Sequence, residues 1–480
     1  MTEKLFKKLT ALIFILAFFL GLVFMIIMPI WEGFDEPVHY AYIQYLGEHG
    51  RKPIYKEDHG SEEIRQTLFS FPLNRNLGIL VKEEERLTYE NYWQKKEDYE
   101  RPEIISTPST RSLDSGYMMV HESQHPPLGY ALFIPVYQVF KHFGFYANFF
   151  ALRFFALLCF LLGLFILKKS FSKLSKDKYL QLIMLSMIVL NSMTYIHLVR
   201  ISNESLVFIL YSLIFYFLVK IFKKKSAGSW RDYLFLGLSY GLGLQTKSFF
   251  MATLPALLFA FGYKIYMSEE RTEELKRVFV SALLLILIGA SYYAHNLLAG
   301  RAFSGLQHGE VKQALALTPI LSFNWLKYFT MIATFFMGAY GWHINLVSKT
   351  YYIVYGSLLV LMLSGFLRAI YLKLVKKVKK LFPEPTLAKV TLVGFFFFLL
   401  VLAGMSYQNY IYNYPNLAVT GGWYFMSLAG FLVTILACGT TLIFRTVRAK
   451  QFLLLTLWSV AGLWFVILFS KYLIPVYYGL

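Results

Sequence analysis

Apolar stretches of about 20 residues alternate with short polar loops along almost the whole chain. A stretch of that length crosses the hydrocarbon core of a bilayer as one α-helix, because a helix satisfies its own backbone hydrogen bonds there. The pattern therefore predicts an all-α integral membrane protein with about eleven transmembrane helices. The expected spans are 9–29, 147–167, 179–198, 204–221, 232–246, 249–266, 277–298, 350–371, 388–406, 422–443 and 452–473.

The positions of lysine and arginine predict the orientation of these helices. The net charge is +19, and the cations gather in short loops between apolar stretches, which is typical of loops that face the cytoplasm. Lys4, Lys7 and Lys8 precede the first span, so we expect a cytoplasmic N-terminus and a multi-pass protein of the cell (inner) membrane. The same distribution argues against a nucleic-acid partner and makes membrane lipids the natural surroundings of the chain.

Two apolar stretches do not fit this alternation as spans. If 128–143 or 324–342 crossed the membrane, the lysine-rich loops at 168–178 and 373–380 would lie outside, so we expect two interfacial helices. The chain then divides into five parts. These are 1–30, the cytoplasmic tail and first span; 31–146, a large extracytoplasmic loop with interfacial helices; 147–298, a transmembrane core; 299–349, a second outer loop with an interfacial helix; and 350–480, the C-terminal spans.

Composition removes some functional classes. Hydrophobic residues make up 57% of the chain and aromatic residues 19%, more apolar surface than one soluble core could bury. The two cysteines, Cys159 and Cys438, both lie inside apolar stretches. They therefore do not indicate a disulfide framework or a thiolate metal site.

The segment 31–40, directly after the first span, is the strongest candidate for chemistry. Asp35 and Glu36, followed by a proline, are typical of a helix start with Asp35 as the N-cap, and the helix is expected to end at Gly50. A cap is one interpretation of Asp35. The other is a general base, because a carboxylate at the membrane surface, with His39 one helical turn further on, could bind an acceptor or a cation.

Two further sets of polar residues are expected on the same outer face. His121 and His125 close the large loop; their spacing is weak support for a metal site, and a solvated loop end is the alternative. Positive side chains at outer span ends could hold a phosphate or could instead extend to lipid headgroups. The candidates for lipid-phosphate binding are Arg200, Lys247, Arg301 and His295.

These motifs resemble the GT-C superfamily of membrane glycosyltransferases, in particular the group of protein O-mannosyltransferases and lipid A aminoarabinose transferases. The resemblance extends over essentially the whole chain, and its most specific part is the Asp-Glu pair together with His-Pro-Pro. The segments that carry it are Phe34–Tyr40, His125–Tyr130, Ala151–Arg153, Ile201–Glu204, Gln245–Lys247 and His295–Asn296.

The resemblance implies a GT-C fold and an inverting transfer of a sugar from a polyprenyl-phosphate donor to an acceptor on the outer face. The expected acceptor is a lipid, a glycan or a protein. In this reading Asp35 is the general base of a catalytic pair with Glu36. His39, His121 and His125 support the acceptor or a divalent metal ion, for which Glu36 and His125 are the candidate ligands.

Two departures from the superfamily pattern bear on the phosphate contacts. Relatives often have Gly-Arg-Tyr where this chain has Gly422-Trp423-Tyr424, and Arg-Asn where it has His295-Asn296. These losses shift the expected phosphate contacts toward Lys247 and the other outer cations. No Trp-Trp-Asp occurs, which argues against the oligosaccharyltransferase branch.

Two other functions stay open at this point. One is a transporter or flippase of lipid-linked glycans, which would need the same cations beside an apolar groove. Such a protein would be expected to carry charges within its spans and to show repeated halves, and the sequence shows neither. The other is a glycan ligase or polymerase that uses a lipid-diphosphate donor.

Overall fold

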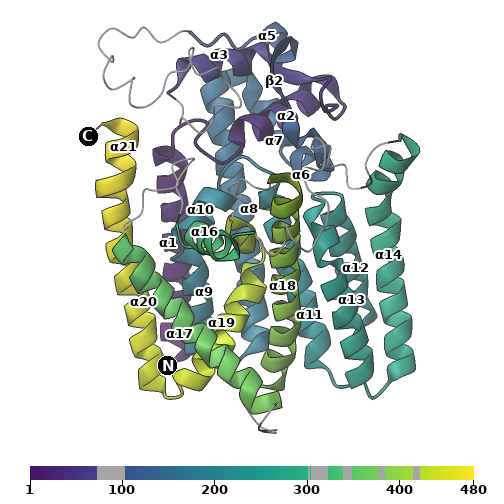
Figure 1. Cartoon of the computed structure of the whole chain (residues 1–480), viewed down its shortest axis with the longest axis vertical. Helices are drawn as coiled ribbons and strands as arrows, with labels where there is room; N and C mark the ends of the chain where they lie inside the picture. Colours follow the sequence, from purple (N-terminus) through teal and green to yellow (C-terminus); the bar gives the residue numbers. More distant parts are fainter. Residues whose placement is uncertain are drawn as a thin grey trace.

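The computed structural model describes residues 1–72, 103–300, 323–338, 349–374, 384–413 and 422–479, together with residues 303, 376 and 378. It shows a bundle of long helices with a smaller group of short elements packed across one end, which we call the cap (Figure 1). The N-terminus lies at the far end of the bundle, and the C-terminus lies at the end that carries the cap (Figure 1). Termini at opposite ends of the bundle are expected for a chain that crosses the membrane an odd number of times.

The cap is built around α2, which follows the first long helix α1 (Glu3–Ile27). Its core is aromatic: the Trp31 ring packs against Tyr40 and Phe149, and the Trp31 indole donates a hydrogen bond to Thr67. The elements of the cap are α2 (Glu36–His49), β1 (His59–Ser61), α3 (Glu62–Ser70), α5 (Pro108–Ser112), β2 (Asp114–Met119), the 3-10 helix η3 (His121–Gln124), α6 (Leu128–Ala131), α7 (Ile134–Phe140) and the 3-10 helix η4 (Lys141–Phe143).

The cap contains one small sheet that the sequence did not predict. β1 and β2 pair antiparallel, with His59 opposite Met119 and Ser61 opposite Asp114, and the register shifts between these two pairs. The strands are too short to stand out as a sequence pattern. The expected stretch 128–143 forms α6, α7 and η4 rather than a single long helix.

Every expected span overlaps helical residues, but 179–198 is divided between two helices. Eight helices in the described ranges are long and apolar enough to cross a membrane, or nine if one bent pair counts as a single span. The helices of the bundle after α1 are α8 (Phe145–Leu174), α9 (Lys178–Val189), α10 (Ser192–Leu198), α11 (Glu204–Lys223), α12 (Trp230–Leu244), α13 (Phe249–Met267), α14 (Arg271–Leu298), α17 (Lys349–Leu374), α18 (Pro385–Asn413), α19 (Ala429–Ile443) and α20 (Val447–Ile467).

The expected continuous span at 179–198 is wrong as a single helix. α9 and α10 are bent by 58° at the break between them. Asn191 is the N-cap of α10, and its side-chain oxygen accepts a hydrogen bond from the Met193 backbone N–H. Because this oxygen replaces an intrahelical partner, the chain can start a new helix in a new direction there.

Two expected spans, 232–246 and 422–443, are represented by helices of only 15 residues, α12 and α19. The 3-10 helix η5 (Gly422–Met426) precedes α19, and the final span continues from α20 through a π-helical turn η6 (Leu468–Leu473) into α21 (Ile474–Tyr478). The short helix α16 (Trp325–Met337) lies across the bundle in Figure 1, consistent with an interfacial helix at this place.

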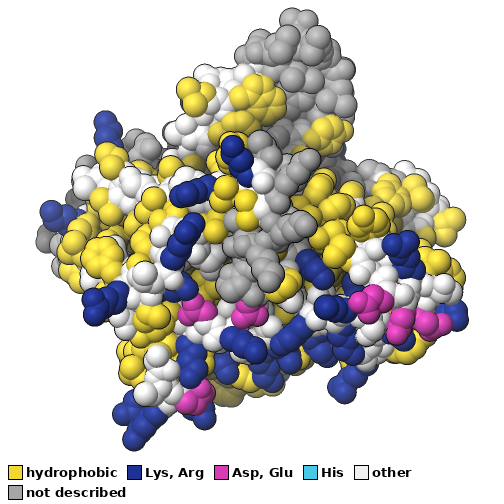
Figure 2. All heavy atoms as spheres, turned by 90° about the horizontal axis from the view of Figure 1, so that it is seen from below, with side chains coloured by type: hydrophobic (Ala, Val, Ile, Leu, Met, Phe, Trp, Pro, Cys, Tyr) yellow, Lys and Arg dark blue, Asp and Glu magenta, His cyan; other side chains and the backbone are white. Residues whose placement is uncertain are grey.

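The lower end of the bundle is rich in positive side chains. Figure 2 shows this face with Lys and Arg outnumbering Asp and Glu around its rim. Exposed cations at this end include Lys169 in α8, Lys224 after α11 and Arg448 in α20. The cap lies at the opposite end (Figure 1), so the face expected to be cytoplasmic and the candidate catalytic segment are on opposite sides of the bundle.

Candidate functional site

The backbone turns sharply just before α2. Trp31 and Asp35 both have positive φ angles, of 72° and 56°, which are rare for residues other than glycine. Gly33 lies between them because space is short: a Cβ atom there would lie 3.0 Å from the Glu36 carboxyl group and 3.1 Å from Arg200 Cβ. The segment is thus folded tightly onto α10 and α11.

The structure corrects the expected capping role of Asp35. α2 does span Glu36–His49 and end at Gly50, as the sequence predicts, and Asp35 does occupy the N-cap position. However, Asp35 adopts the left-handed conformation, and its side chain makes no capping hydrogen bond to α2. A carboxylate held in an uncommon backbone conformation without the capping contact is a candidate for a functional rather than a local structural role.

Glu36 has a different environment from Asp35. Its side chain is fully buried and both carboxylate oxygens accept hydrogen bonds from Arg153, at 2.8 Å from Nε and 2.6 Å from Nη2. The Ile201 backbone N–H also donates to Glu36. Arg153 in turn donates to the carbonyl oxygens of Met25, Met28 and Pro29 at the end of α1. Glu36 therefore connects α1, α2, α8 and the segment between α10 and α11.

Glu122 brings the two histidines of the sequence motifs together. Its Oε2 atom accepts a hydrogen bond from the Tyr130 hydroxyl at 2.9 Å and lies 3.2 Å from His125 Nε2 and 3.7 Å from His39 Nδ1. His39 Nδ1 lies 2.9 Å from the same Tyr130 hydroxyl. A phenol has one proton, and Tyr130 gives it to Glu122; His39 must therefore donate from Nδ1, which leaves Nε2 as an acceptor.

The His-Pro-Pro segment packs directly on the bundle. A Cβ atom at Gly129 would lie 2.7 Å from Asn203 Cβ and 3.0 Å from Thr246 Cγ2, so only glycine allows this approach. The Leu128 N–H donates to the Gln245 carbonyl. Motifs that are far apart in the sequence, at 125–130, 201–204 and 245–247, therefore meet at one place.

Lys247 lies in this meeting place and is paired with Glu204. Its ammonium contacts Glu204 Oε1 and lies 4.8 Å from the centroid of the Tyr424 ring. The other Glu204 oxygen accepts a hydrogen bond from Ser427 at 2.6 Å and lies 3.4 Å from His197 Nε2. Lys247 is 7% exposed and Glu204 1%, so this is a buried charge pair.

Arg200 is the second buried cation of the site. It is 6% exposed, its Nε donates weakly to the His197 carbonyl at 3.4 Å, and its guanidinium lies 5.8 Å from the Phe34 ring centroid. Among the described residues, its Nη1 atom has no hydrogen-bond partner, and neither has either polar atom of the Asn203 amide. Buried polar groups are normally satisfied, so these groups indicate a place where a polar ligand could bind.

The charges of these residues act on one another. Burial and the Glu122 carboxylate raise the pKa of Asp35 to about 6, although Arg200 and Lys247 oppose this rise. Burial lowers the pKa of His39 well below its ordinary value, and the two cations act in the same direction, so His39 is neutral. Burial lowers the pKa of Lys247, but Glu204 outweighs it and the net pKa is raised.

The remaining candidates differ in where they lie. His121 acts electrostatically on the Asp35 carboxyl group and therefore belongs to the surroundings of the site. His295 is exposed near the end of α14, and none of the interactions described above involves it. Arg301 lies outside the described residues.

The residues proposed from the sequence as metal ligands do not form a metal site. In the described part of the chain no group of three or more His, Cys, Asp or Glu side chains is arranged to hold a metal ion. Both Glu36 oxygens are engaged by Arg153, and His125 faces Glu122.

Sequence reasoning missed four members of the cluster as site residues: Glu122, Tyr130, Glu204 and Ser427. Glu122 stood between the two histidines and could have been singled out as their partner. Glu204 lies in the first turn of α11, where the N-cap residue Asn203 makes no side-chain capping bond, and it pairs with Lys247. Ser427, distant in sequence, carried no local signal.

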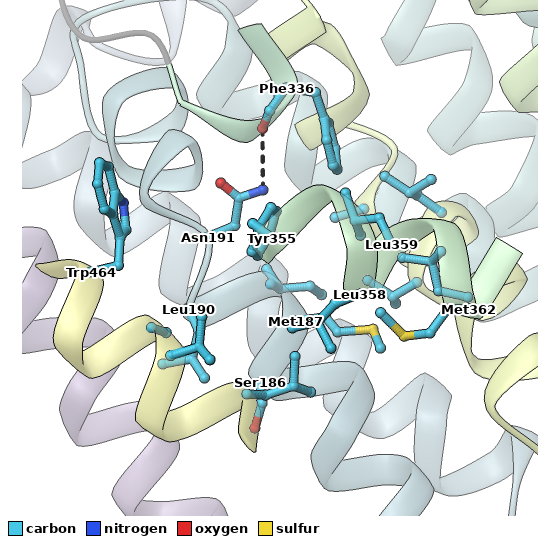
Figure 3. Close-up of a pocket in the computed structure, with 18 of the residues that line it drawn as sticks. Ser186, Met187, Leu190, Asn191, Phe336, Tyr355, Leu358, Leu359, Met362 and Trp464 are labelled. Carbon is cyan, nitrogen blue, oxygen red and sulfur yellow. Dashed lines mark hydrogen bonds between the residues drawn. The ribbon is translucent and has the colours of Figure 1, made fainter. Parts of the chain in front are cut away.

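An apolar crevice lies between helices of the bundle. Met426 is one of its walls and is adjacent to Ser427, which contacts Glu204. Figure 3 shows Asn191 donating to the Phe336 carbonyl at one end, with methionine and leucine side chains further in. Other lining residues come from α9, α17, α19 and α20 and include Met187, Tyr355, Leu359, Met362, Leu436 and Trp464.

Comparison with known proteins assigns the chain to a family. The family described as predicted membrane protein (DUF2142) matches residues 18–432. The chain belongs to this family. The matched range includes Asp35, Glu122, Glu204 and Lys247, and extends beyond Ser427. No curated protein matches the chain in sequence.

Two solved structures of the oligosaccharyltransferase of Archaeoglobus fulgidus resemble the fold. The complex with Zn and sulfate gives a TM-score of 0.40 at 12% identity, covering 97% of this chain and 52% of that one. The apo form gives 0.41 at 11% identity, covering 97% and 55%. The chain thus spans about half the length of these proteins.

Proposed function

We propose that this protein is a membrane glycosyltransferase that moves a sugar from a polyprenyl-phosphate donor to an acceptor on the outer face. The observation that supports it best is that two buried cations at the cap end of the bundle, Arg200 and Lys247, both act electrostatically on the carboxyl group of Asp35. The cluster thus combines a carboxyl group whose pKa is about 6 with two buried cations. The carboxylate can accept a proton, and the cations can bind a phosphate.

In the proposed reaction, an acceptor hydroxyl attacks the anomeric carbon of the sugar. The new carbon–oxygen bond forms as the bond to the phosphate oxygen breaks, so the configuration at that carbon inverts. The hydroxyl proton passes to Asp35, and the electron pair of the broken bond leaves with the polyprenyl phosphate. Arg200 and Lys247 stabilise the negative charge that develops on that phosphate.

The surroundings of the cluster suit an amphiphilic donor. The apolar crevice between α9, α17, α19 and α20 is lined by Met426, whose neighbour Ser427 contacts Glu204 of the polar cluster. A polyprenyl chain could lie along such apolar walls while its phosphate reaches Lys247. Glu36, fixed by Arg153, positions the segment that carries Asp35 rather than contacting substrate.

The test is transfer from radiolabelled polyprenyl-phosphate sugars to a membrane extract by purified protein, with wild type compared against Asp35→Asn. We expect transfer by wild type and, for Asp35→Asn, a transfer rate that is lower by on the order of 100-fold or more, because a general base contributes a factor of this size. Asp58→Asn is the matched control, because Asp58 lies in the cap but pairs with Arg51. Full activity of a folded Asp35→Asn protein would overturn the base assignment. Absence of transfer from every donor, with transport of a lipid-linked glycan into vesicles, would favour a flippase.

A further inference from the structure

Lys247, the proposed phosphate ligand, already forms an ion pair with Glu204. An acidic residue in the first turn of a helix is common because it complements the helix dipole, but such residues are usually exposed. Glu204 is 1% exposed and is held from two sides, by Lys247 on one oxygen and by Ser427 and His197 on the other. This arrangement exceeds what a helix start requires.

The two sides of Glu204 differ in how freely they can move. His197 lies on α10 and Ser427 between η5 and α19, and both residues are buried. Lys247 lies between α12 and α13 and carries its ammonium on a flexible four-carbon side chain. The ammonium can therefore turn away while Glu204 stays in place.

Unpartnered polar groups that would suit a phosphate lie directly before Glu204 in the chain. Arg200 Nη1 and the Asn203 amide are buried without hydrogen-bond partners among the described residues, and Asn203 directly precedes Glu204 at the start of α11. A phosphate bound there would gain a guanidinium donor, an amide donor and the N-terminal end of a 20-residue helix.

We propose that Glu204 is an internal counter-ion of the phosphate site, which holds Lys247 until a lipid phosphate competes for its ammonium. This inference rests on the proposed function, since it takes polyprenyl phosphate as the ligand. Glu204 neutralises the buried lysine in the free protein, and it repels the phosphate in the bound one. It therefore sets how tightly the lipid product and donor are held.

Binding of polyprenyl monophosphate to the full-length protein in detergent, measured by calorimetry, tests the inference without any transfer step. Glu204→Gln removes the competing charge and retains an amide for Ser427, so we expect binding to tighten on the order of tenfold. Binding of the uncharged polyprenol of the same chain length should not change. The double variant Glu204→Gln/Lys247→Gln should lose the gain, because the gain depends on the released ammonium.

Glu273→Gln is the matched control, since Glu273 is exposed on α14 and pairs with Lys276. If wild type binds polyprenyl phosphate and Glu204→Gln binds it equally or more weakly, Glu204 is structural and the inference is wrong. If wild type does not bind polyprenyl phosphate, the proposed function itself fails. Should Glu204→Gln not fold, Glu204→Asp, whose shorter carboxylate loosens the contact with Lys247, decides: affinity equal to or below wild type overturns the inference.

Discussion

Asp35 shows how one residue can combine several unfavourable features. Its backbone is in the left-handed region, its carboxyl group is partly buried, and its neighbour Glu122 carries the same charge. Each of these features costs free energy in the folded state. The neighbouring cations Arg200 and Lys247 offset part of the cost, which is why the pKa of Asp35 rises only to about 6.

The pH dependence of transfer follows from this pKa. As a general base, Asp35 must be ionised, so the rate is expected to fall as the pH drops through about 6 and to level off above it. An aspartate with an ordinary pKa would remain active to about pH 4. The pH profile of kcat/KM measures this; a profile that stays flat down to pH 4 would contradict the role.

The stability of the protein should change with pH in a matching way. Because the folded-state pKa of Asp35 is raised, its contribution favours the folded state at low pH and is lost as the pH rises through about 6. Asp35→Asn should therefore increase the free energy of unfolding at pH 7.5 by about 1–3 kcal/mol and have little effect at pH 4. The thermal unfolding temperature at the two pH values measures this.

Asp58 provides the opposite sign as a control. Burial raises its pKa, but hydrogen bonds from Arg51 and Tyr45 outweigh this and lower it overall. Its stabilising contribution is present at neutral pH and is lost in acid, so Asp58→Asn should destabilise the protein at pH 7.5. If Asp35→Asn and Asp58→Asn shift the unfolding temperature at pH 7.5 in the same direction, the raised pKa assigned to Asp35 is wrong.

At the scale of elements, the Glu36–Arg153 pair connects helices that the chain separates. The two side chains are 0% and 2% exposed, and Arg153 also satisfies carbonyl groups at the end of α1. Such carbonyls have no partner within their own helix. Arg153 of α8 thus binds both the end of α1 and the first turn of α2. These contacts position the segment that carries Asp35.

Breaking this pair should be costly. Arg153→Met leaves the Glu36 carboxylate buried without a partner, and we expect a loss of about 3–5 kcal/mol in stability. The double variant Glu36→Gln/Arg153→Met should recover part of it, because no buried charge remains. Thermal unfolding in detergent measures both. Arg51→Met is the control: its pair with Asp58 has a 52% exposed arginine side chain and should matter by about 1 kcal/mol or less.

At the scale of the whole molecule, the charge distribution and the cap define two faces. The cationic loops gather at the end opposite the cap (Figures 1 and 2). Loops rich in Lys and Arg face the cytoplasm in membrane proteins, so the cap and its cluster are expected outside. A lipid-linked donor would then meet its acceptor on that outer face.

Accessibility to a membrane-impermeant maleimide tests this orientation in intact cells. In a background lacking Cys159 and Cys438, we expect Leu113→Cys, exposed in the cap, to be labelled at once. Lys224→Cys, exposed at the opposite end, should be labelled only after the membrane is permeabilised. The reverse pattern would invert the topology and place the cluster in the cytoplasm.

Much of the architecture could be predicted from the sequence, because hydrophobic length and charge bias are local properties. The start and end of α2 followed from Asp35, Glu36 and Gly50, and the position of each long helix followed from its apolar stretch. The break at Asn191 was missed, since an asparagine within an apolar stretch can either continue a helix or cap a new one. Only the surrounding packing decides between these.

The sequence by itself determined that this is a membrane protein of many helices with acidic and histidine motifs on one loop and a few isolated cations elsewhere. Only the tertiary structure decided which charges meet. Glu204 and Ser427 are 223 residues apart, and Glu36 and Arg153 are 117 apart. A charge pair of this kind leaves no trace in local spacing, because its energy depends on burial and on distances that exist only after the helices have packed.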